Sequence, residues 1–395
     1  MTRSVAITGM AVASSLGAGL DATWEALLGG STAVATTTYG GGPFSGAGFA
    51  AVLSSDLPEV AAFERKRLRA LSRESLLVSR VGALAWRDAG FDVGGAPTPA
   101  DVGVVLGTTT AGLDDYLRVL HDGVIHGPAL VSPSSGPQAS LNAVASELSV
   151  SARAEGSIVT VTAGRCSGSH ALAVGADQVL TGAAEAVLVA AVETLDPTAA
   201  RVDRPGTGPF SAGHGGAVPG EAVVVLVLES LDRARDRGAR VLAEVPGWST
   251  VRGDAGQDAA VRAALAALRE AGLDADDIGL VCSSATGCPG VDGPEARALH
   301  EVMGPSVPVF SPFGALGDCA GASGVVQLAL TVRALEAGLA PPTCGFTGWD
   351  PCLPTIGVAA RAQQLPLAPA LVLTTDAGGQ AAALVLRPPG AGGGA

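Results

Sequence analysis

The sequence predicts an α/β fold made of two similar halves, and three features carry that prediction. Apolar runs such as "GEAVVVLVLES" have the length of a strand without polar alternation, which is typical of a sheet covered by helices on both faces. Alanine-rich segments bounded by glycines have the pattern of helices. Finally, helix and strand segments recur in the same order along the chain, which indicates an internal duplication.

The first recurring unit is a helix, a glycine turn and a strand. "ALAWRDAGFD" at 83–92 is followed by "DVGVVLGTTT" at 101–110. "LAALREAGLD" at 265–274 and "DIGLVCSSAT" at 277–286 repeat this order. In each copy the glycine after the helix favours its termination, and the apolar run that follows predicts a buried strand.

The second recurring unit is a glycine-bounded helix. Gly168 opens an alanine-rich segment that closes at Gly182, and Gly324 opens "VVQLALTVRALEAG", which closes at Gly338. Because the two segments have the same length and the same bounding residues, they indicate equivalent helices in the two halves.

An all-apolar strand completes each copy, at 220–230 and again at 379–387. The sequence therefore predicts halves at 1–236 and 237–390. The closing glycine-rich segment, 391–395, is expected to be a flexible tail.

Composition and charge limit the classes of function. A net charge of −13 argues against a broad basic surface for nucleic acid or anionic lipid, which favours small ligands or protein partners. The apolar runs are shorter than the roughly 20 residues of a membrane helix, so no span is expected. The N-terminus has no basic region ahead of a long apolar stretch, and we expect a cytoplasmic protein without a signal peptide.

The chain has six cysteines, which we expect to be reduced thiols in the cytoplasm. Cys282 and Cys288 lack the CxxC spacing of a zinc site, so the sequence predicts no metal and no cofactor.

One cysteine lies where a nucleophile is often found. In "TVTAGRCSGSHAL", residues 160–172, a β-branched run leads through a tight turn to a helix, and Cys166 stands at the turn. A helix N-terminus favours a thiolate, so Cys166 is a candidate nucleophile. The alternative is a small buried apolar side chain, which is common for free cysteine and which the lack of a histidine in the expected partner motifs favours.

Four segments resemble the β-ketoacyl synthases of the thiolase-like superfamily. They are "VAITGMAVASSLGAGLDATWEALLGG", "DVGVVLGTTTAGL", "PFSAGHGGAVPGEAVVVLVLE" and "LEAGLAPPT", and they stand in the family's order over essentially the whole chain. The resemblance implies a five-layer αβαβα fold and a dimer in which the strand at about Ser157 to Thr162 pairs with its counterpart in the partner.

The family's nucleophilic cysteine belongs to a Cys-x-Ser-Gly pattern, and Gly168 sets its register here. Arg165 stands at that position. Cys166 is one place later, and on a helix it would be rotated by about 100° from the catalytic direction. Counting from the strand side instead places Gly164 at the nucleophile position.

The remaining catalytic positions of the family have also changed. The first histidine motif reads "SSATGC", which puts Ser284 in place of the histidine, and the second reads "GDCAGASG", which puts Asp318 there. An aspartate would repel a forming enolate. Phe313 replaces the family's lysine, and the only lysine of the chain is Lys66. Ala377 stands at the position of a gating phenylalanine.

Two former catalytic positions carry opposite charges. If Arg165 and Asp318 still face each other, they form a buried ion pair that plugs the site. The alternative is an arginine that points to solvent or across a dimer interface.

Two further features, a basic cluster and an apolar stripe, each have a functional interpretation and a purely structural one. The basic cluster either receives an acidic acyl carrier protein or is a solvated helix face; it consists of Arg65, Lys66, Arg67, Arg69 and Arg73. The stripe either lines a chain tunnel at the interface, as the resemblance implies, or belongs to the core; it consists of Leu113, Tyr116, Leu117 and Leu120.

A synthase-like subunit without catalytic residues resembles the chain length factor of type II polyketide synthases, which pairs with a catalytic ketosynthase. The sequence therefore predicts a non-catalytic subunit that shapes a polyketide tunnel and meets the acyl carrier protein. Chain length factors usually carry glutamine where Arg165 stands, so a divergent subgroup is one option. An acyl-transferring enzyme that uses Cys166 and a homodimeric scaffold of the same fold are the alternatives.

Overall fold

The structure is a computed structural model, and it describes residues 4–41, 44–53, 71–133, 135–195, 202, 206, 208–213, 216–254 and 256–389. The first portion of the chain forms β1 (Val5–Ser14), α1 (Leu20–Leu28), β2 (Ala35–Gly41), β3 (Phe44–Ala50), α3 (Arg73–Asp88), η1 (Pro99–Asp101), β4 (Val102–Gly107), α4 (Leu113–His126), η2 (Pro128–Leu130), η3 (Gly136–Ala139), α5 (Ala143–Ala152), β5 (Ile158–Val161), α6 (Ser167–Thr181), β6 (Ala186–Glu193), β7 (Ala222–Ser230) and α7 (Leu231–Asp236).

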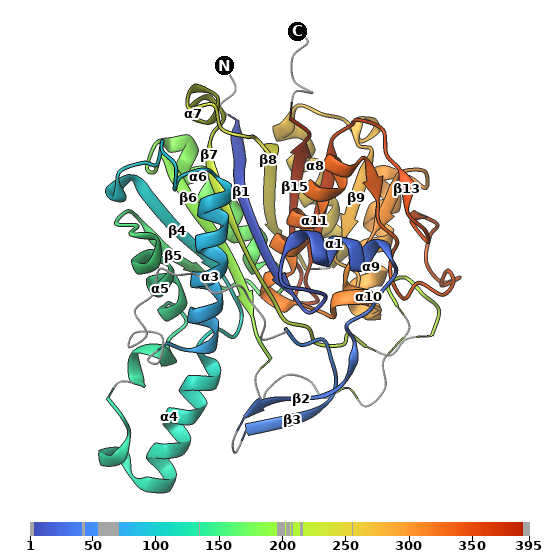
Figure 1. Cartoon of the computed structure of the whole chain (residues 1–395). Coiled ribbons are helices and arrows are strands. Elements are labelled where there is room, and N and C mark those ends of the chain that lie inside the picture. The colour runs from blue at the N-terminus through green and yellow to red at the C-terminus, as the bar shows by residue number, and fades with distance from the viewer. Residues whose placement is uncertain are drawn as a thin grey trace.

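The second portion repeats much of this order (Figure 1). It forms β8 (Ala243–Arg252), α8 (Gly256–Ala271), η4 (Ala275–Asp277), β9 (Leu280–Ser283), α9 (Pro289–Met303), β10 (Pro308–Phe310), α10 (Phe313–Leu316), η5 (Ala320–Ala322), α11 (Ser323–Ala337), β11 (Leu339–Ala340), β12 (Gly357–Val358), β13 (Gln363–Gln364), β14 (Ala370–Thr375) and β15 (Gln380–Arg387).

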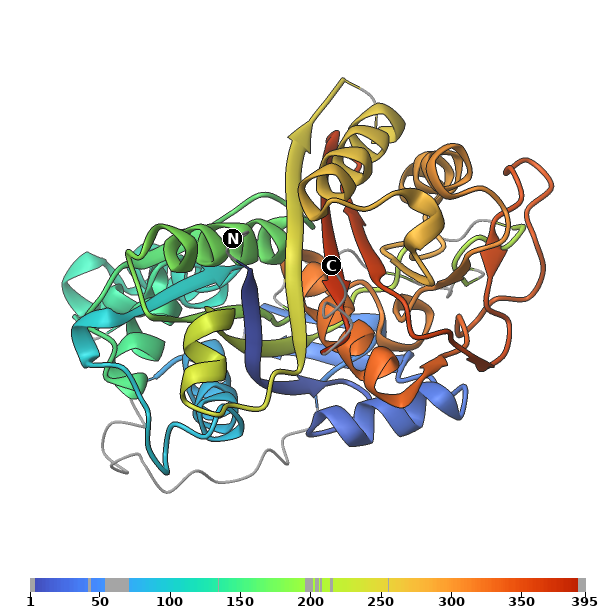
Figure 2. The same ribbon diagram turned by 90° about the horizontal axis from the view of Figure 1, so that it is seen from above.

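An 11-stranded sheet runs through the molecule in the order β12-β10-β9-β14-β15-β8-β1-β7-β6-β4-β5. Its two portions are joined where Val5–Ile7 of β1 pair with Ala243–Val245 of β8 (Figure 2). Helices α3 and α5 cover the outer face of the first portion, α8 covers that of the second, and α6 and α11 lie between them. The five-layer α/β fold is therefore confirmed. The boundary at 236/237 stays a prediction.

The central strands are apolar because helices cover both of their faces. Every residue of β1 and β6 is buried, as the absence of polar alternation predicts. Within the described residues, no helix combines the length and the apolar character that crossing a bilayer requires.

The two middle helices meet at the glycines that the sequence singled out. A Cβ on Gly324 would lie 1.9 Å from the Ser169 Oγ, and one on Gly168 would lie 2.8 Å from a methyl of Val325. Both positions are glycine because the helices approach too closely for a side chain. This contact brings the N-terminal ends of α6 and α11 together at the centre of the fold.

Two elements stand away from the layers. The hairpin of β2 and β3 and the helix α4 extend from the lower side of the molecule in Figure 1. At the end of the sheet, β5 is an edge strand, and Ile158 on it is 45% exposed.

Candidate functional site

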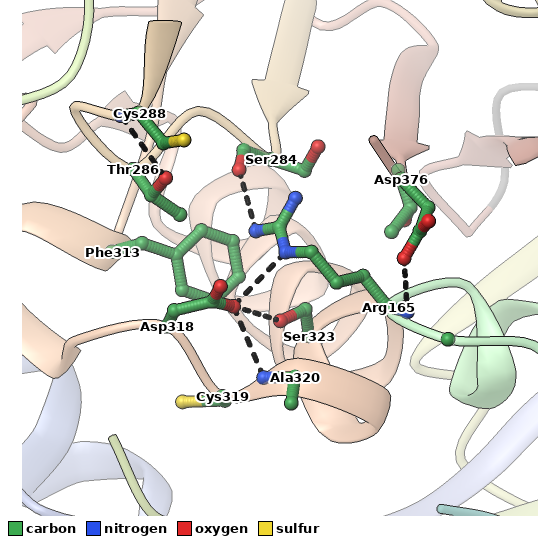
Figure 3. A network of polar contacts seen from close by, with 12 residues as sticks. Arg165, Ser284, Thr286, Cys288, Phe313, Asp318, Cys319, Ala320, Ser323 and Asp376 are labelled. Atoms are coloured by element: carbon green, nitrogen blue, oxygen red, sulfur yellow. Dashed lines mark hydrogen bonds and ion pairs between the residues drawn. The ribbon is translucent and has the colours of Figure 1, made fainter. Parts of the chain in front are cut away.

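The fold brings the altered catalytic positions together around one side chain, Arg165 (Figure 3). Arg165 comes from the turn between β5 and α6. Ser284 follows β9, Phe313 opens α10, and Asp318 precedes η5. Positions far apart in the sequence therefore line one small region at the ends of the two middle helices.

The expected ion pair is present. The Nε of Arg165 donates to the Oδ1 of Asp318 at 3.0 Å. The two terminal nitrogens donate to the carbonyl oxygens of Thr375 and Ser284, each at 2.8 Å. Arg165 is 8% exposed, so the interpretation of an arginine pointing to solvent is wrong. Every nitrogen of the guanidinium has an acceptor, which is what a buried arginine requires.

Neighbouring groups hold both partners of the ion pair in place. Asp318 also accepts from the backbone N–H of Ala320 at 3.1 Å. The ring of Phe313 lies beneath Arg165, with the guanidinium carbon 5.8 Å from the ring centroid. The phenylalanine at the former lysine position thus packs against the cation that fills the site.

A buried carboxylate lies on the other side of Arg165. Glu295 is fully buried and accepts from the backbone N–H of Ser284 at 2.8 Å, from the Ser284 Oγ at 2.6 Å and from the Thr375 Oγ1 at 2.8 Å. Burial raises the pKa of Glu295, although these hydrogen bonds oppose the shift. For Arg165, burial lowers the pKa, but Asp318 and then Glu295 outweigh it and leave the pKa raised.

Cys166 is the residue before the first turn of α6, and its side chain is fully buried. Its Sγ donates to the carbonyl oxygen of Thr374 at 3.5 Å. Burial raises the pKa of Cys166 to about 12, even though the Arg165 charge opposes the shift. The helix N-terminus therefore does not produce a thiolate here, and the thiol is protonated at neutral pH.

The turn before α6 also leaves no room at Gly164. Gly164 has a positive φ of 57°, and a Cβ there would lie 2.4 Å from the Oδ2 of Asp376. The same oxygen accepts from the backbone N–H of Arg165 at 2.9 Å. A backbone donor at this helix start, of the kind that could stabilise an oxyanion, is thus bound to a carboxylate of the chain itself.

Sequence reasoning missed Glu295, Thr375 and Asp376. Asp376 lies beside Ala377, which is exposed, in the loop "TTDAGGQA" that the sequence had marked only for its missing phenylalanine. An acidic residue beside a glycine-rich turn was the available signal. No such signal existed for Glu295, because a lone glutamate on a helix usually faces solvent.

A cavity of about 530 Å³ lies on the far side of Phe313. Phe313, Thr286, Val218 and Cys344 are among the described residues that line it, and Arg165 is not. Phe313 therefore separates this space from the guanidinium.

The apolar stripe lies on α4, which has no buried residue. Tyr116 and Leu120 are each 46% exposed, and Leu113 and Leu117 are half-buried. The core interpretation is therefore wrong for the chain by itself. The tunnel interpretation stays a prediction, as does the absence of a metal or cofactor.

Most of the basic cluster, residues 65–69, lies outside the described residues. Arg73 is described, and its guanidinium donates to both carboxylate oxygens of Glu221, at 2.6 and 2.8 Å. Arg73 is thus engaged within the chain.

Comparison with known families agrees with this fold. The β-ketoacyl synthase N-terminal domain matches residues 2–234, and the β-ketoacyl synthase C-terminal domain matches residues 247–347. The chain belongs to the β-ketoacyl synthase family.

Individual relatives come from polyketide pathways. The tetracenomycin polyketide synthase ketoacyl synthase alpha subunit of Streptomyces glaucescens is 31% identical over 98% of this chain and 97% of its own length. A structure described as the ishigamide ketosynthase/chain length factor superposes with a TM-score of 0.86 at 24% identity, over 99% of this chain and 100% of that one. A chain of a structure described as a type II PKS acyl-carrier protein in complex with its ketosynthase matches with a TM-score of 0.84 at 21% identity, over 98% of this chain and 100% of that one.

Proposed function

We propose that this chain is a non-catalytic, chain-length-factor-type subunit of a type II polyketide synthase. It pairs with a catalytic ketosynthase in the cytoplasm and forms one wall of the tunnel that holds the growing chain. The proposal depends above all on the Arg165 network, which fills the place of the nucleophile with a buried and fully bonded cation.

No residue of this network can catalyse the condensation. A ketosynthase needs a thiolate, two histidines and a lysine, and the corresponding positions hold Arg165, Ser284, Asp318 and Phe313. The nearest thiol, Cys166, has a pKa of about 12 because it is buried. A second polypeptide must therefore supply the reaction.

The exposure of β5 and α4 supports the proposal that a partner binds on the side of the molecule where they lie. β5 ends the sheet, and an unpaired edge strand is a template for pairing with another chain. Val124, which is 81% exposed, follows Tyr116 and Leu120 of the apolar stripe on α4 at the same spacing of four residues, so it extends the stripe. In the proposed heterodimer this stripe faces the tunnel.

The acyl carrier protein is the proposed third component. A fold neighbour is described as a type II acyl-carrier protein in complex with its ketosynthase. With a net charge of −13, this chain is a poor electrostatic match for an acidic carrier, so the carrier is expected to dock mainly on the ketosynthase.

Co-expression with the ketosynthase encoded nearest to this gene tests the proposal. Native mass measurement is expected to give a one-to-one heterodimer that condenses malonyl units, while the chain alone condenses none. A population of homodimers alone, in the presence of that ketosynthase, would favour the scaffold alternative. Condensation by the chain alone would favour the enzyme alternative.

A further inference from the structure

The beginnings of α3 and α4 both line a charged cavity of about 360 Å³. The charged residues of its lining come from both helices and from the segment before β7; they are Arg73, Glu74, Asp114, Asp115, Arg118 and Glu221. Carboxylates outnumber arginines in this set. Among the described residues, carboxylates are therefore in excess at the base of α4.

Both arginines that line the cavity already form an ion pair with a carboxylate. Arg73 forms its two bonds with Glu221, and the Arg118 Nε donates to the Asp114 Oδ2 at 3.0 Å. Glu74 is buried and accepts from the Thr194 Oγ1 at 2.5 Å. Asp115 is the remaining carboxyl, and the charges of Glu74 and Asp114 act on it.

α4 makes few contacts with the layers of the fold. It has no buried residue, and its most extensive contacts are with η2 and η3, the segments that follow it in the chain. Figure 1 shows the helix standing away from the sheet layers. A change of free energy at its first turn therefore acts on the position of the whole helix.

We propose that the junction of α4 and α3 is a proton-sensitive hinge: protonation of Asp115 holds α4 against the body, and ionisation of Asp115 beside Glu74 and Asp114 loosens it. The hinge is a property of this chain by itself and does not depend on the proposed function. In a heterodimer it would set how readily the apolar stripe of α4 adapts to a partner.

The sign follows from proton linkage. Burial first, then Glu74 and Asp114, raise the pKa of Asp115 from 3.8 to about 6, while Arg118 opposes the shift. A raised pKa means that the docked helix binds the proton more tightly than the released helix. The docked arrangement is thus favoured fully below pH 4, and this advantage is lost as the pH rises through 6.

Hydrogen–deuterium exchange of the full chain, followed in peptides that cover 113–126, tests the hinge. After correction for the intrinsic exchange rate, exchange of α4 is expected to rise up to about tenfold from pH 5 to pH 7, the limit that linkage allows for one carboxyl with these pKa values. Peptides from β1 and β7 are expected to show no such rise, because both strands are in the core.

Asp115→Asn is the decisive variant. It is expected to hold exchange of α4 at the slow level at both pH values, and Glu74→Gln is expected to shrink the rise. Asp122→Asn, the same change at an exposed site of the same helix, is the matched control and should leave the rise intact.

Two histidines, His121 and His126, also lie on α4 and need their own control. The variant His121→Asn/His126→Asn is expected to keep the rise. If Asp115→Asn keeps the rise, or if the unaltered chain has none, the hinge proposal is wrong. Neither outcome bears on the catalytic inactivity proposed above.

Discussion

The region around Arg165 and the base of α4 both crowd charged groups together, yet they differ in how those charges are matched. Arg165 is buried and has an acceptor for each of its guanidinium nitrogens. At the base of α4, both arginines are engaged and Asp115 is left beside two other carboxylates. Complete pairing thus fixes the Arg165 side chain in one position, whereas incomplete pairing at the base of α4 underlies the hinge proposed above.

Replacing the buried cation of Arg165 should have the largest effect on the stability of the chain. Arg165→Met leaves the buried Glu295 and the half-buried Asp318 without their counter-charge, and we expect it to lower the free energy of unfolding by about 3–5 kcal/mol. Urea denaturation of the purified chain measures the loss. The variant should also become relatively more stable as the pH falls from 8 to 5, because burial raises the pKa of Glu295 and the loss of the nearby cation raises it further.

The double variant Arg165→Met/Asp318→Leu is the control for this change. Because it removes both charges of the ion pair and leaves only Glu295 without a counter-charge, it should recover part of the lost stability. A stability loss below about 1 kcal/mol in Arg165→Met would mean that the pair does not hold the site together.

A change at the edge strand tests whether the exposed side is the interface. Ser157 and Val161 turn their carbonyl groups toward β4, so Thr160 directs its backbone N–H away from the sheet. Thr160→Pro therefore removes an outward donor, and we expect about tenfold weaker association with the ketosynthase. Titration with the partner under native mass measurement gives the affinity, and Thr160→Val should bind normally. Equal affinities for the two variants would place the interface elsewhere.

The apolar stripe of α4 should affect the product more than the stability. Tyr116→Ala enlarges the proposed tunnel without opening a cavity in the core, because Tyr116 is 46% exposed. The reconstituted complex is expected to make longer chains, with the free energy of unfolding changed by less than about 0.5 kcal/mol. Mass analysis of the products checks this. Unchanged chain lengths with Tyr116→Ala and with Leu113→Ala would remove α4 from the tunnel wall.

Cys166→Ala should have the smallest effect on turnover. The thiol is buried and its pKa is about 12, so about one thiol in ten thousand is ionised at pH 8. Complexes that contain this variant should keep nearly full activity in a malonyl condensation assay. Loss of turnover from an intact complex would show that Cys166 takes part in the reaction.

Much of the fold was predictable because it depends on local patterns. The glycines that bound α6 and α11, and the apolar runs of β6 and β7, predict these elements directly. The Arg165–Asp318 pair was one of two open interpretations, since the sequence indicates opposite charges but not their directions. Glu295 and Asp376 were missed because their importance arises from long-range packing, which brings Glu295 to Thr375 and Asp376 to the turn at Arg165.

The position of α4 was the least predictable part. Its apolar spacing fits a helix that packs in the core and an exposed helix that binds a partner equally well. The exposed fractions of Tyr116 and Leu120 rule out the core interpretation for the chain by itself, and they depend on the tertiary structure.

The most direct test of the sealed site is to incubate the purified chain with a malonyl and an acyl thioester of the acyl carrier protein and to measure its intact mass. Our account predicts an unchanged mass and no condensed product. An acyl adduct that maps to Cys166 would contradict it.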